Sequence, residues 1–406
     1  MKMEKTDGFG RYNTIRQRLR DLSEHLEIEH YRYPIAVFVV LRVWTSFWAF
    51  ISAAFVPAPS YGINQMYGMS PLSGNVNQVL WAPWQRWDTI WYTKIAEQGY
   101  SQSDLSPAYF PLYPTLIKIL TPLLSNGVAA GVVIATIAAL ASFIMLYKLT
   151  DDQYGHLVAQ RAVLYLASFP TAFYLFGAYT ESLFLALGLG MFVSVRAKRW
   201  ELGCIIGGLA ALTRPQGMLL VLPLAIEFIL QYRRGEIALK RAVSITIVGA
   251  SGIAFWVFLA LKFSDPLIWF RVQSWWHRAS WPWESIGATL GQVVKAQNAV
   301  DALVSLPDGI FALLFLGFTL WSTFRLSPTF SAYMIVIVFP PLFGLTIYSP
   351  LLPLASMSRY VVVAFPAFIL LGQMFASSLP QRLIVTFSFL FQTFWLILFA
   401  AWIFVG

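Results

Sequence analysis

Long apolar segments recur along the whole chain and are separated by short polar connections. Each approaches the roughly 20 residues that an α-helix needs to cross the hydrocarbon core of a bilayer. Because the segments are continuous rather than alternating, they indicate helices and not a β-barrel. We therefore predict an all-α protein that crosses a membrane many times, with about eleven transmembrane helices. Their ranges are roughly 34–57, 127–149, 157–176, 180–196, 201–213, 216–232, 240–262, 307–324, 329–348, 359–376 and 382–404.

The composition supports this class of protein. Of the 406 residues, 58% are hydrophobic and 12% are charged, whereas a soluble domain has about 25% charged residues. The net charge of +9 comes from basic residues between apolar segments, where they set orientation, so we expect no nucleic-acid partner. Cys204 is the single cysteine, which excludes an internal disulfide. The sequence shows no nucleotide-binding glycine loop and no metal-binding histidine pair, so we expect no cofactor and no metal.

The basic residues also predict how the chain is oriented. Residues 1–33 are polar and basic and are expected in the cytoplasm, before a single transmembrane domain at 34–406. Alternation from this start places the basic cluster 196–199 in the cytoplasm and the carboxyl terminus outside. Two long outer loops, at 58–110 and 263–306, are expected to carry helices that lie at the membrane interface.

The first outer loop holds an acid among aromatic residues. Residues 87–100 read WDTIWYTKIAEQGY, and a helix over 84–98 would place several side chains on one face. Those residues are Trp84, Asp88, Trp91, Tyr92 and Ile95. Aromatic neighbours would desolvate Asp88 and make it more basic, which suits a reaction that needs one general base. Glu97, nine residues on, would point to the opposite face. Alternatively, the helix is an interfacial anchor in which Asp88 caps a turn.

Five motifs follow one another along the chain. After the 87–100 stretch comes AYFPLYP at 108–114, with two prolines that we expect to interrupt helix, followed by AYTESLF at 178–184. ALTRPQG at 211–217 and SRYVVVAFP at 358–366 complete the series. Together they resemble the PIG-V-type mannosyltransferases of the GT-C superfamily of membrane glycosyltransferases, over roughly residues 34–376. The first-loop motif is fairly specific and the later ones are short. The short chain favours a prokaryotic relative, in a plasma membrane, with its active site facing outward.

The resemblance implies an activity. It is the inverting transfer of a hexose, with mannose expected, from a polyprenyl-phosphate sugar to a hydroxyl of a lipid or glycan acceptor on the outer face. The first-loop acid of the family corresponds to Asp88, which would be the catalytic base. Such a donor carries its own leaving group, so the chemistry needs a base on the acceptor and positive charge near the departing phosphate.

Two arginines on the predicted outer side are candidates for binding the donor phosphate. The apolar run 202–212 before Arg214 has 11 residues, or about 17 Å of helix, which is too short to cross the membrane. Thr213 to Gln216 (TRPQ) predicts a new helix start there, with Thr213 as the N-cap, and a helix N-terminus favours anions. Arg359 lies at another predicted outer helix start and would bind the same phosphate or an anionic group of the acceptor. The alternatives are that Arg214 snorkels to the surface and that Arg359 contacts lipid headgroups.

The remaining candidates surround the acid loop. Glu181 begins a predicted helix, where it either stabilises the helix N-terminus or orients substrate or Arg214. Residues 264–306 contain many tryptophans, which form either a platform for a sugar ring or a set of interfacial anchors. The expected substrate contacts are Trp87, Trp91, Tyr92, Glu97, Tyr109, Glu181, His277 and Arg278.

Two other functions are compatible with the number of spans. One is a transporter or flippase for a lipid-linked glycan, although transporters usually have two related halves with broken helices at matching positions. Only one break, near Thr213, is evident in this sequence. The other is a non-catalytic, lipid-binding subunit of a membrane complex, for which Asp88→Asn would leave function intact.

Overall fold

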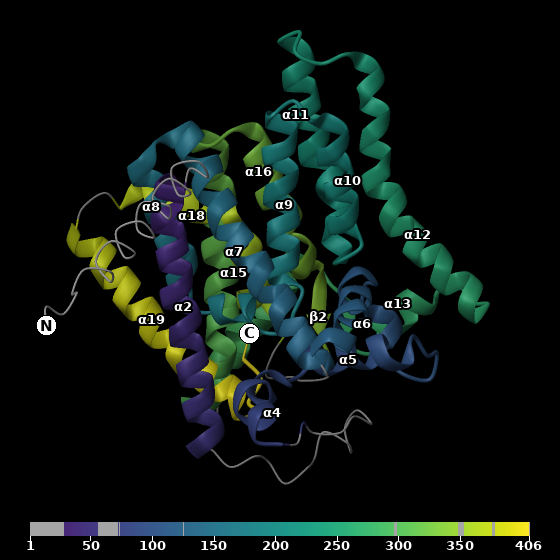
Figure 1. Cartoon of the computed structure of the whole chain (residues 1–406), viewed down its shortest axis with the longest axis vertical. Coiled ribbons are helices and arrows are strands. Elements are labelled where there is room, and N and C mark those ends of the chain that lie inside the picture. The colour runs from purple at the N-terminus through teal and green to yellow at the C-terminus, as the bar shows by residue number, and fades with distance from the viewer. Residues whose placement is uncertain are drawn as a thin grey trace, which may run out of the picture.

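The structure, a computed structural model, describes residues 28–55, 72, 74–124, 126–295, 299–347, 353–375 and 378–405. Predictions about residues 1–27, most of the basic amino-terminal segment, and about residues 56–71 of the first outer loop lie outside this range. Long helices run side by side to form a bundle, and short helices gather at one of its ends (Figure 1). The all-α, multi-span class predicted from the sequence is confirmed.

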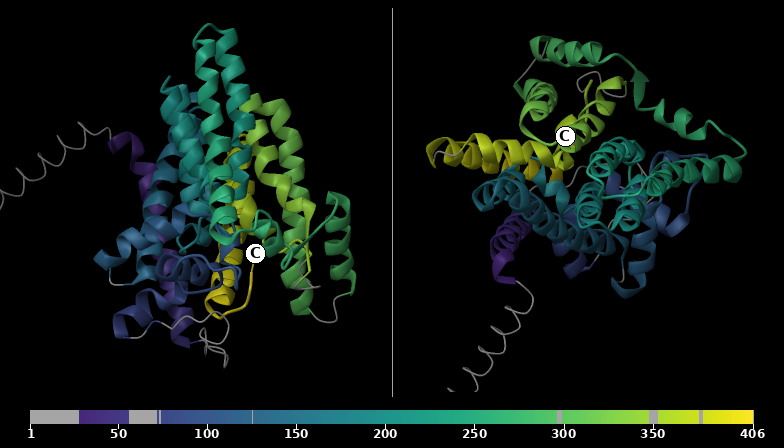
Figure 2. Two further views of the ribbon diagram at one scale, coloured as in Figure 1. Left: turned by 90° about the vertical axis from the view of Figure 1, so that its right-hand side faces the viewer. Right: turned by 90° about the horizontal axis from the view of Figure 1, so that it is seen from above.

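A helix occupies each of the eleven apolar segments predicted from the sequence. These helices are α2 (Ile28–Phe55), α7 (Gly127–Tyr154), α8 (His156–Ser168), α9 (Glu181–Arg196), α10 (Trp200–Ala211), α11 (Val221–Arg233), α12 (Thr246–Phe263), α15 (Ala299–Arg325), α16 (Pro328–Val338), α18 (Phe365–Met374) and α19 (Ser378–Ala400). Figure 2 shows the same bundle from the side and from above.

Only some of these helices are long and apolar enough to cross a membrane. Within the described residues there are six, or seven if the bent pair Met357–Val363 and Phe365–Met374 is one span. Helices α8, α9, α10 and α16 have 13, 16, 12 and 11 residues, so they extend for about 17–24 Å. Prolines explain several of the short lengths, because Pro170 follows α8 and Pro340 follows α16. Fewer full-length spans therefore form than the sequence predicted.

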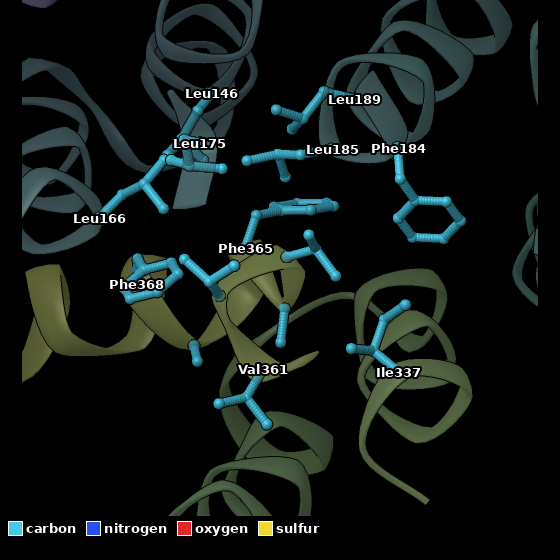
Figure 3. Packing of buried hydrophobic residues seen from close by; sticks show 14 of the residues in the cluster. Leu146, Leu166, Leu175, Phe184, Leu185, Leu189, Ile337, Val361, Phe365 and Phe368 are labelled. Atoms are coloured by element: carbon cyan, nitrogen blue, oxygen red, sulfur yellow. The ribbon is translucent and has the colours of Figure 1, made fainter. Parts of the chain in front are cut away.

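The interior of the bundle is built from closely packed apolar side chains. Figure 3 shows leucines and phenylalanines of α7, α8, α9 and α18 meeting around Phe365. Small residues let segments approach α7, since a Cβ on Gly131 would lie 2.6 Å from the Cβ of Ala178. Close packing of this kind, rather than hydrophobic burial, drives helix association within a bilayer.

Short elements occupy the end of the bundle that is lowest in Figure 1. They are α4 (Asn75–Leu80), η1 (Ala82–Trp84), α5 (Asp88–Gln98), η2 (Ser106–Ala108), α6 (Leu112–Leu124), α13 (Ile268–Gln273), α14 (Pro282–Lys295) and α17 (Met357–Tyr360). Strands β1 (His277–Ala279) and β2 (Gly344–Thr346) pair antiparallel, with His277 opposite Thr346. The two predicted outer loops thus contain short helices as expected, but the ribbon was not foreseen. Pro111 and Pro114 flank the start of α6 instead of interrupting a helix, because proline is tolerated in a first turn.

The basic loops lie at the opposite end of the bundle. There, Trp200 Nε1 donates to the carbonyl of Arg241, and Gln231 Nε2 donates to that of Val195. Helix α9 runs from Glu181 at the short-helix end to Arg196 at the basic end, a separation of about 24 Å. The predicted separation of the basic cluster from the acid loop is therefore present, while the membrane side of each stays a prediction.

Candidate active site

A cavity of ≈ 870 Å³ lies among the short elements at the lower end of the bundle. Four charged side chains line it, and each comes from a different one of the sequence motifs: Asp88, Glu181, Arg214 and Arg359. Hydrogen bonds to backbone carbonyls bring the motifs together. Thr89 Oγ1 donates to the carbonyl of Ala178, and the backbone N–H of Leu112 donates to the carbonyl of Leu212. Segments far apart in sequence thus form one site.

The four charged residues form an alternating chain of ion pairs. Arg359 Nη1 lies 2.6 Å from Asp88 Oδ2, and Arg359 Nε lies 3.4 Å from Glu181 Oε1. The same Glu181 oxygen lies 3.1 Å from Arg214 Nη1. The side chains of Glu181, Arg359 and Arg214 are only 2%, 7% and 9% exposed, whereas Asp88 is 23% exposed. Because burying a charge is costly unless it is paired, this alternation permits four charges to share one cavity.

Asp88 is the first residue of α5, where a negative charge is favourable for the helix. Both of its carboxylate oxygens have partners, since Tyr109 donates its hydroxyl to Oδ1 at 3.1 Å while Arg359 donates to Oδ2. The prediction placed aromatic neighbours around this acid, and the structure adds the ion pair with Arg359. The expected helix over 84–98 was also wrong at its start, because the backbone turns at Trp87 (φ 48°) and leaves Trp84 in η1. Trp91 and Tyr92 still line the cavity beside Asp88, as predicted.

Tyr109 is held in place by aromatic rings on several sides. It stacks on Trp91 with ring centroids 5.8 Å apart, and its ring packs edge-to-face with Tyr92 and Trp276. Burial raises the pKa of Tyr109 well above its ordinary value, and the negative charge of Asp88 is the second cause. The phenol therefore remains protonated and acts as a hydrogen-bond donor to Asp88. This geometry makes Tyr109 a residue that orients the acid as well as a cavity wall.

The two arginines are buried in the protein, contrary to both alternatives considered from the sequence. Arg214 pairs with Glu181, and its guanidinium lies 5.2 Å from the ring of Tyr360, so it does not snorkel to the surface. Arg359 lies over the ring of Tyr179 and pairs with two acids, so it is not a headgroup contact. Glu181 touches both arginines, which supports the interpretation that it orients Arg214.

The predicted cap at Thr213 was wrong in detail. The new helical segment begins as η4 (Pro215–Leu220), Arg214 is its N-cap residue, and Thr213 Oγ1 donates backward to the carbonyl of Ala210. The side-chain oxygen Oε1 of Gln216 makes no hydrogen bond to any residue that the structure describes. The break after α10 nevertheless exists as predicted, and it places Arg214 at the cavity.

The remaining predicted substrate contacts divide into two groups. Trp87 and His277 line the cavity together with Trp269 and Trp276. Burial lowers the pKa of His277, so the imidazole is neutral near pH 7. Glu97 and Arg278 are exposed and lie outside the cavity lining, so the prediction that they contact substrate there is not supported. Helical spacing turns Glu97 away from Asp88, and strand alternation turns Arg278 away from the face of His277.

The tryptophans of the second predicted outer loop fall into two groups by position. Trp269 and Trp276 face the cavity, whereas three others are exposed and suit an interfacial anchor. Those three are Trp275, Trp281 and Trp283, with exposed fractions of 68%, 56% and 66%. The sugar platform and the interfacial anchor both stay predictions, the first for the tryptophans that line the cavity and the second for the exposed ones.

Two buried ionisable residues that support the site were not identified from the sequence. Asp308 near the start of the α15 membrane segment accepts the backbone N–H of Ser358, the residue before Arg359, at 2.8 Å. Arg86 donates from Nε and Nη2 to the carbonyl of Ala400, just after which the chain turns back to the site. A signal was present in both cases, because an ionisable residue beside or within an apolar segment marks a functional region by default.

Within the described residues, no group of three His, Cys, Asp or Glu side chains is arranged to hold a metal ion.

No family model matches the chain. Over 151 residues, the chain is 30% identical to GPI mannosyltransferase 2 of Schizosaccharomyces pombe. That match covers 36% of this chain and 32% of the relative, so the chain spans about a third of the relative's length. ArnT from Cupriavidus metallidurans, in a crystal structure bound to undecaprenyl phosphate, is similar over 85% of this chain and 61% of its own. The TM-score is 0.47 and the sequence identity is 16%.

Proposed function

We propose that this protein is a membrane glycosyltransferase of the PIG-V type in the GT-C superfamily. In this proposal it transfers a hexose from a polyprenyl-phosphate donor to a hydroxyl group of a lipid or glycan acceptor. The observation that carries the proposal is the meeting of Asp88, Arg359 and Arg214 in one cavity, although they come from three distant segments. A base and two cations are the groups that displacement of a phosphate requires. The partial match to a mannosyltransferase supports mannose as the hexose.

The reaction assigns one role to each charged group. Asp88 takes the proton of the acceptor hydroxyl as the hydroxyl oxygen attacks the anomeric carbon. The bond from that carbon to the phosphate oxygen breaks, and the phosphate leaves with the electron pair. Arg214 and Arg359 stabilise the negative charge on the departing phosphate. One displacement inverts the anomeric configuration, by analogy with the single-step inverting glycosidases.

The rest of the cavity lining suits the binding of the sugar that is transferred from the donor to the acceptor. Aromatic side chains of Trp91, Trp269 and Trp276 line the cavity and suit contact with a sugar ring, and the neutral His277 offers a donor or an acceptor. Each guanidinium has five N–H donors, so pairing with Asp88 and Glu181 leaves donors for a phosphate. Glu181 holds the two arginines side by side through a single oxygen.

The proposed location is a prokaryotic plasma membrane with the cavity facing outward. The basic cluster at 196–199 would then face the cytoplasm, as the positive-inside rule requires. Single cysteines introduced at the exposed residues Glu97 and Lys198, in a Cys204→Ser background, test this orientation. An impermeant reagent added to whole cells should label the cysteine at position 97 and not the one at 198. The reverse pattern would contradict the proposal.

Purified protein supplied with a labelled polyprenyl-phosphate mannose and a membrane acceptor tests the activity. We expect labelled glycan product, one polyprenyl phosphate released per transfer, and a product anomer opposite to that of the donor by nuclear magnetic resonance. Retention of configuration would contradict the single displacement. Movement of a lipid-linked glycan across liposomes without covalent transfer would instead favour the transporter or flippase.

A further inference from the structure

The residues after α19 lie against the turn that presents Asp88. In Figure 1 the carboxyl-terminal end is at the same end of the bundle as α5. The carbonyl of Ala400 accepts two hydrogen bonds from the Arg86 guanidinium, at 3.0 and 2.8 Å. The ring of Trp402 covers the same guanidinium at 4.7 Å. Residues 401–405, here called the tail, are therefore fixed to the loop that leads into α5.

The tail contacts a strained residue immediately before the acid. Trp87 has φ 48°, a backbone conformation that bulky residues rarely adopt. Its indole packs against Trp402 with centroids 5.7 Å apart and against Phe404 at 5.4 Å, the latter with perpendicular rings. Strained conformations persist only where the surroundings hold them, and they cluster at functional sites. The two tail rings supply that support for Trp87.

The tail also reaches the other partner of the ion pair. Tyr174 donates its hydroxyl to the carbonyl of Val405, and the ring of Tyr174 lies 5.5 Å from the guanidinium of Arg359. One short segment therefore touches the supports of both Asp88 and Arg359. Phe404 additionally forms part of the cavity wall.

We propose that Trp402 and Phe404 are positioning residues for the reaction, an inference that rests on the proposed role of Asp88. Their rings hold Trp87 in its strained conformation, and this fixes the first turn of α5 and the direction of the Asp88 carboxylate. A displacement of about 1 Å in a reacting group can lower a rate by about 10²-fold. The tail thus acts on catalysis through Trp87 and not by direct chemistry.

Alanine substitutions in the tail test this inference by transfer of labelled hexose from polyprenyl phosphate. We expect Trp402→Ala and Phe404→Ala each to lower kcat by about 10- to 10²-fold, and Trp402→Ala, which lies outside the cavity lining, to leave the KM for the donor within about twofold. Trp402→Phe should keep most of the activity, because a ring still packs on Trp87. Ile403→Ala is the matched control. Ile403 lies between Trp402 and Phe404 in the sequence, and its side chain is 42% exposed. It should behave as the wild type does.

The same substitutions in an Asp88→Asn background distinguish positioning from general destabilisation. Without the carboxylate there is nothing left to position. A tail substitution should therefore lower the residual rate of Asp88→Asn by no more than about twofold. Equal losses in both backgrounds, or an equal loss in Ile403→Ala, would overturn the inference. If Trp402→Ala does not accumulate in membranes, Phe404→Ala provides the same comparison. A wild-type protein that transfers no sugar would contradict the proposed function instead.

Discussion

The carboxylate of Asp88 and the guanidinium of Arg359 lie 2.6 Å apart, although 271 residues separate them in the sequence. Arg359 also reaches Glu181, so a single side chain links the acid of the first loop to the start of α9. The proposed base and a proposed phosphate ligand are thus in direct contact. Substitution of either residue should therefore affect the other.

Replacing Arg359 by lysine keeps the charge but removes the planar fork that contacts two acids through two nitrogens. Because a lysine ammonium is a single point charge, we expect Arg359→Lys to lower kcat by about 10²-fold. Arg271→Lys is the control, since Arg271 pairs with Asp265 on the protein surface and is 67% exposed. It should lose no more than about twofold. Steady-state transfer assays at matched protein levels make the comparison, and equal effects of the two substitutions would remove the special role of Arg359.

Glu181 is a single buried acid between two arginines. Glu181→Gln removes the charge that both guanidinium groups share, and breaking a buried ion pair costs about 3–5 kcal/mol. We expect a lower thermal midpoint in detergent and a donor KM raised by about tenfold or more. Glu227→Gln is the matched control, because Glu227 is also buried but bonds to Gln231 and Thr329 at the basic end. A shift of donor KM in both variants would show a general packing defect.

Tyr109 supplies the second contact to the Asp88 carboxylate. Tyr109→Phe removes that hydrogen bond but keeps the stacking on Trp91. A hydrogen bond to a charged group contributes about 1.5–3 kcal/mol, so kcat should fall by at least about tenfold. Tyr165→Phe is the control, because the Tyr165 hydroxyl has no hydrogen-bond partner among the described residues. Unchanged kcat in Tyr109→Phe would show that Arg359 alone orients the acid.

The hydrophobic pattern was sufficient to predict the class of fold and the location of the helix in each of the eleven apolar segments, but not the bounds of short helices such as α6 and α13. It overestimated the number of full-length spans because it does not show where a proline ends a helix inside an apolar run, as at Pro170 and Pro340. The β1–β2 ribbon also escaped prediction. A strand of three residues is too short to show the alternation of apolar and polar residues by which strands are recognised. The pairing of β1 with β2 also joins segments that are distant in the sequence.

The sequence predicted the components of the site better than their contacts. Asp88, Arg214, Glu181 and Arg359 were all identified from their motifs, and all four line the cavity. The ion pairs that Arg359 makes with Asp88 and Glu181 were not predicted, because spacing along a helix gives no information about segments more than 100 residues apart. Glu97 was predicted to contact substrate but lies outside the cavity lining. Its motif suggested a substrate contact, although helical geometry already directed it away.

Acid sensitivity is expected from His277. Burial lowers the pKa of this imidazole below its usual 6.5, so the folded protein holds it neutral. As the pH falls below about 6.5, the unfolded chain takes up a proton that the folded protein accepts only at lower pH. Stability should therefore fall as the pH is lowered from 7.5 to 5.5. His277→Gln has no such group, so its thermal midpoint should fall less over this range. An identical fall in both proteins would assign the acid sensitivity to other residues.

The most direct test compares two acids of the same helix, Asp88 and Glu97. Asp88→Asn keeps the shape of the side chain but removes the base, whereas Glu97 is exposed and lies outside the cavity lining. The measurement is transfer of labelled hexose from a polyprenyl phosphate to the native acceptor, in membranes with matched protein levels. We predict that Asp88→Asn lowers the rate by about 10²- to 10⁴-fold and that Glu97→Gln has a mild effect. Full activity in Asp88→Asn, or a larger loss in Glu97→Gln, would contradict the assignment of Asp88 as the base.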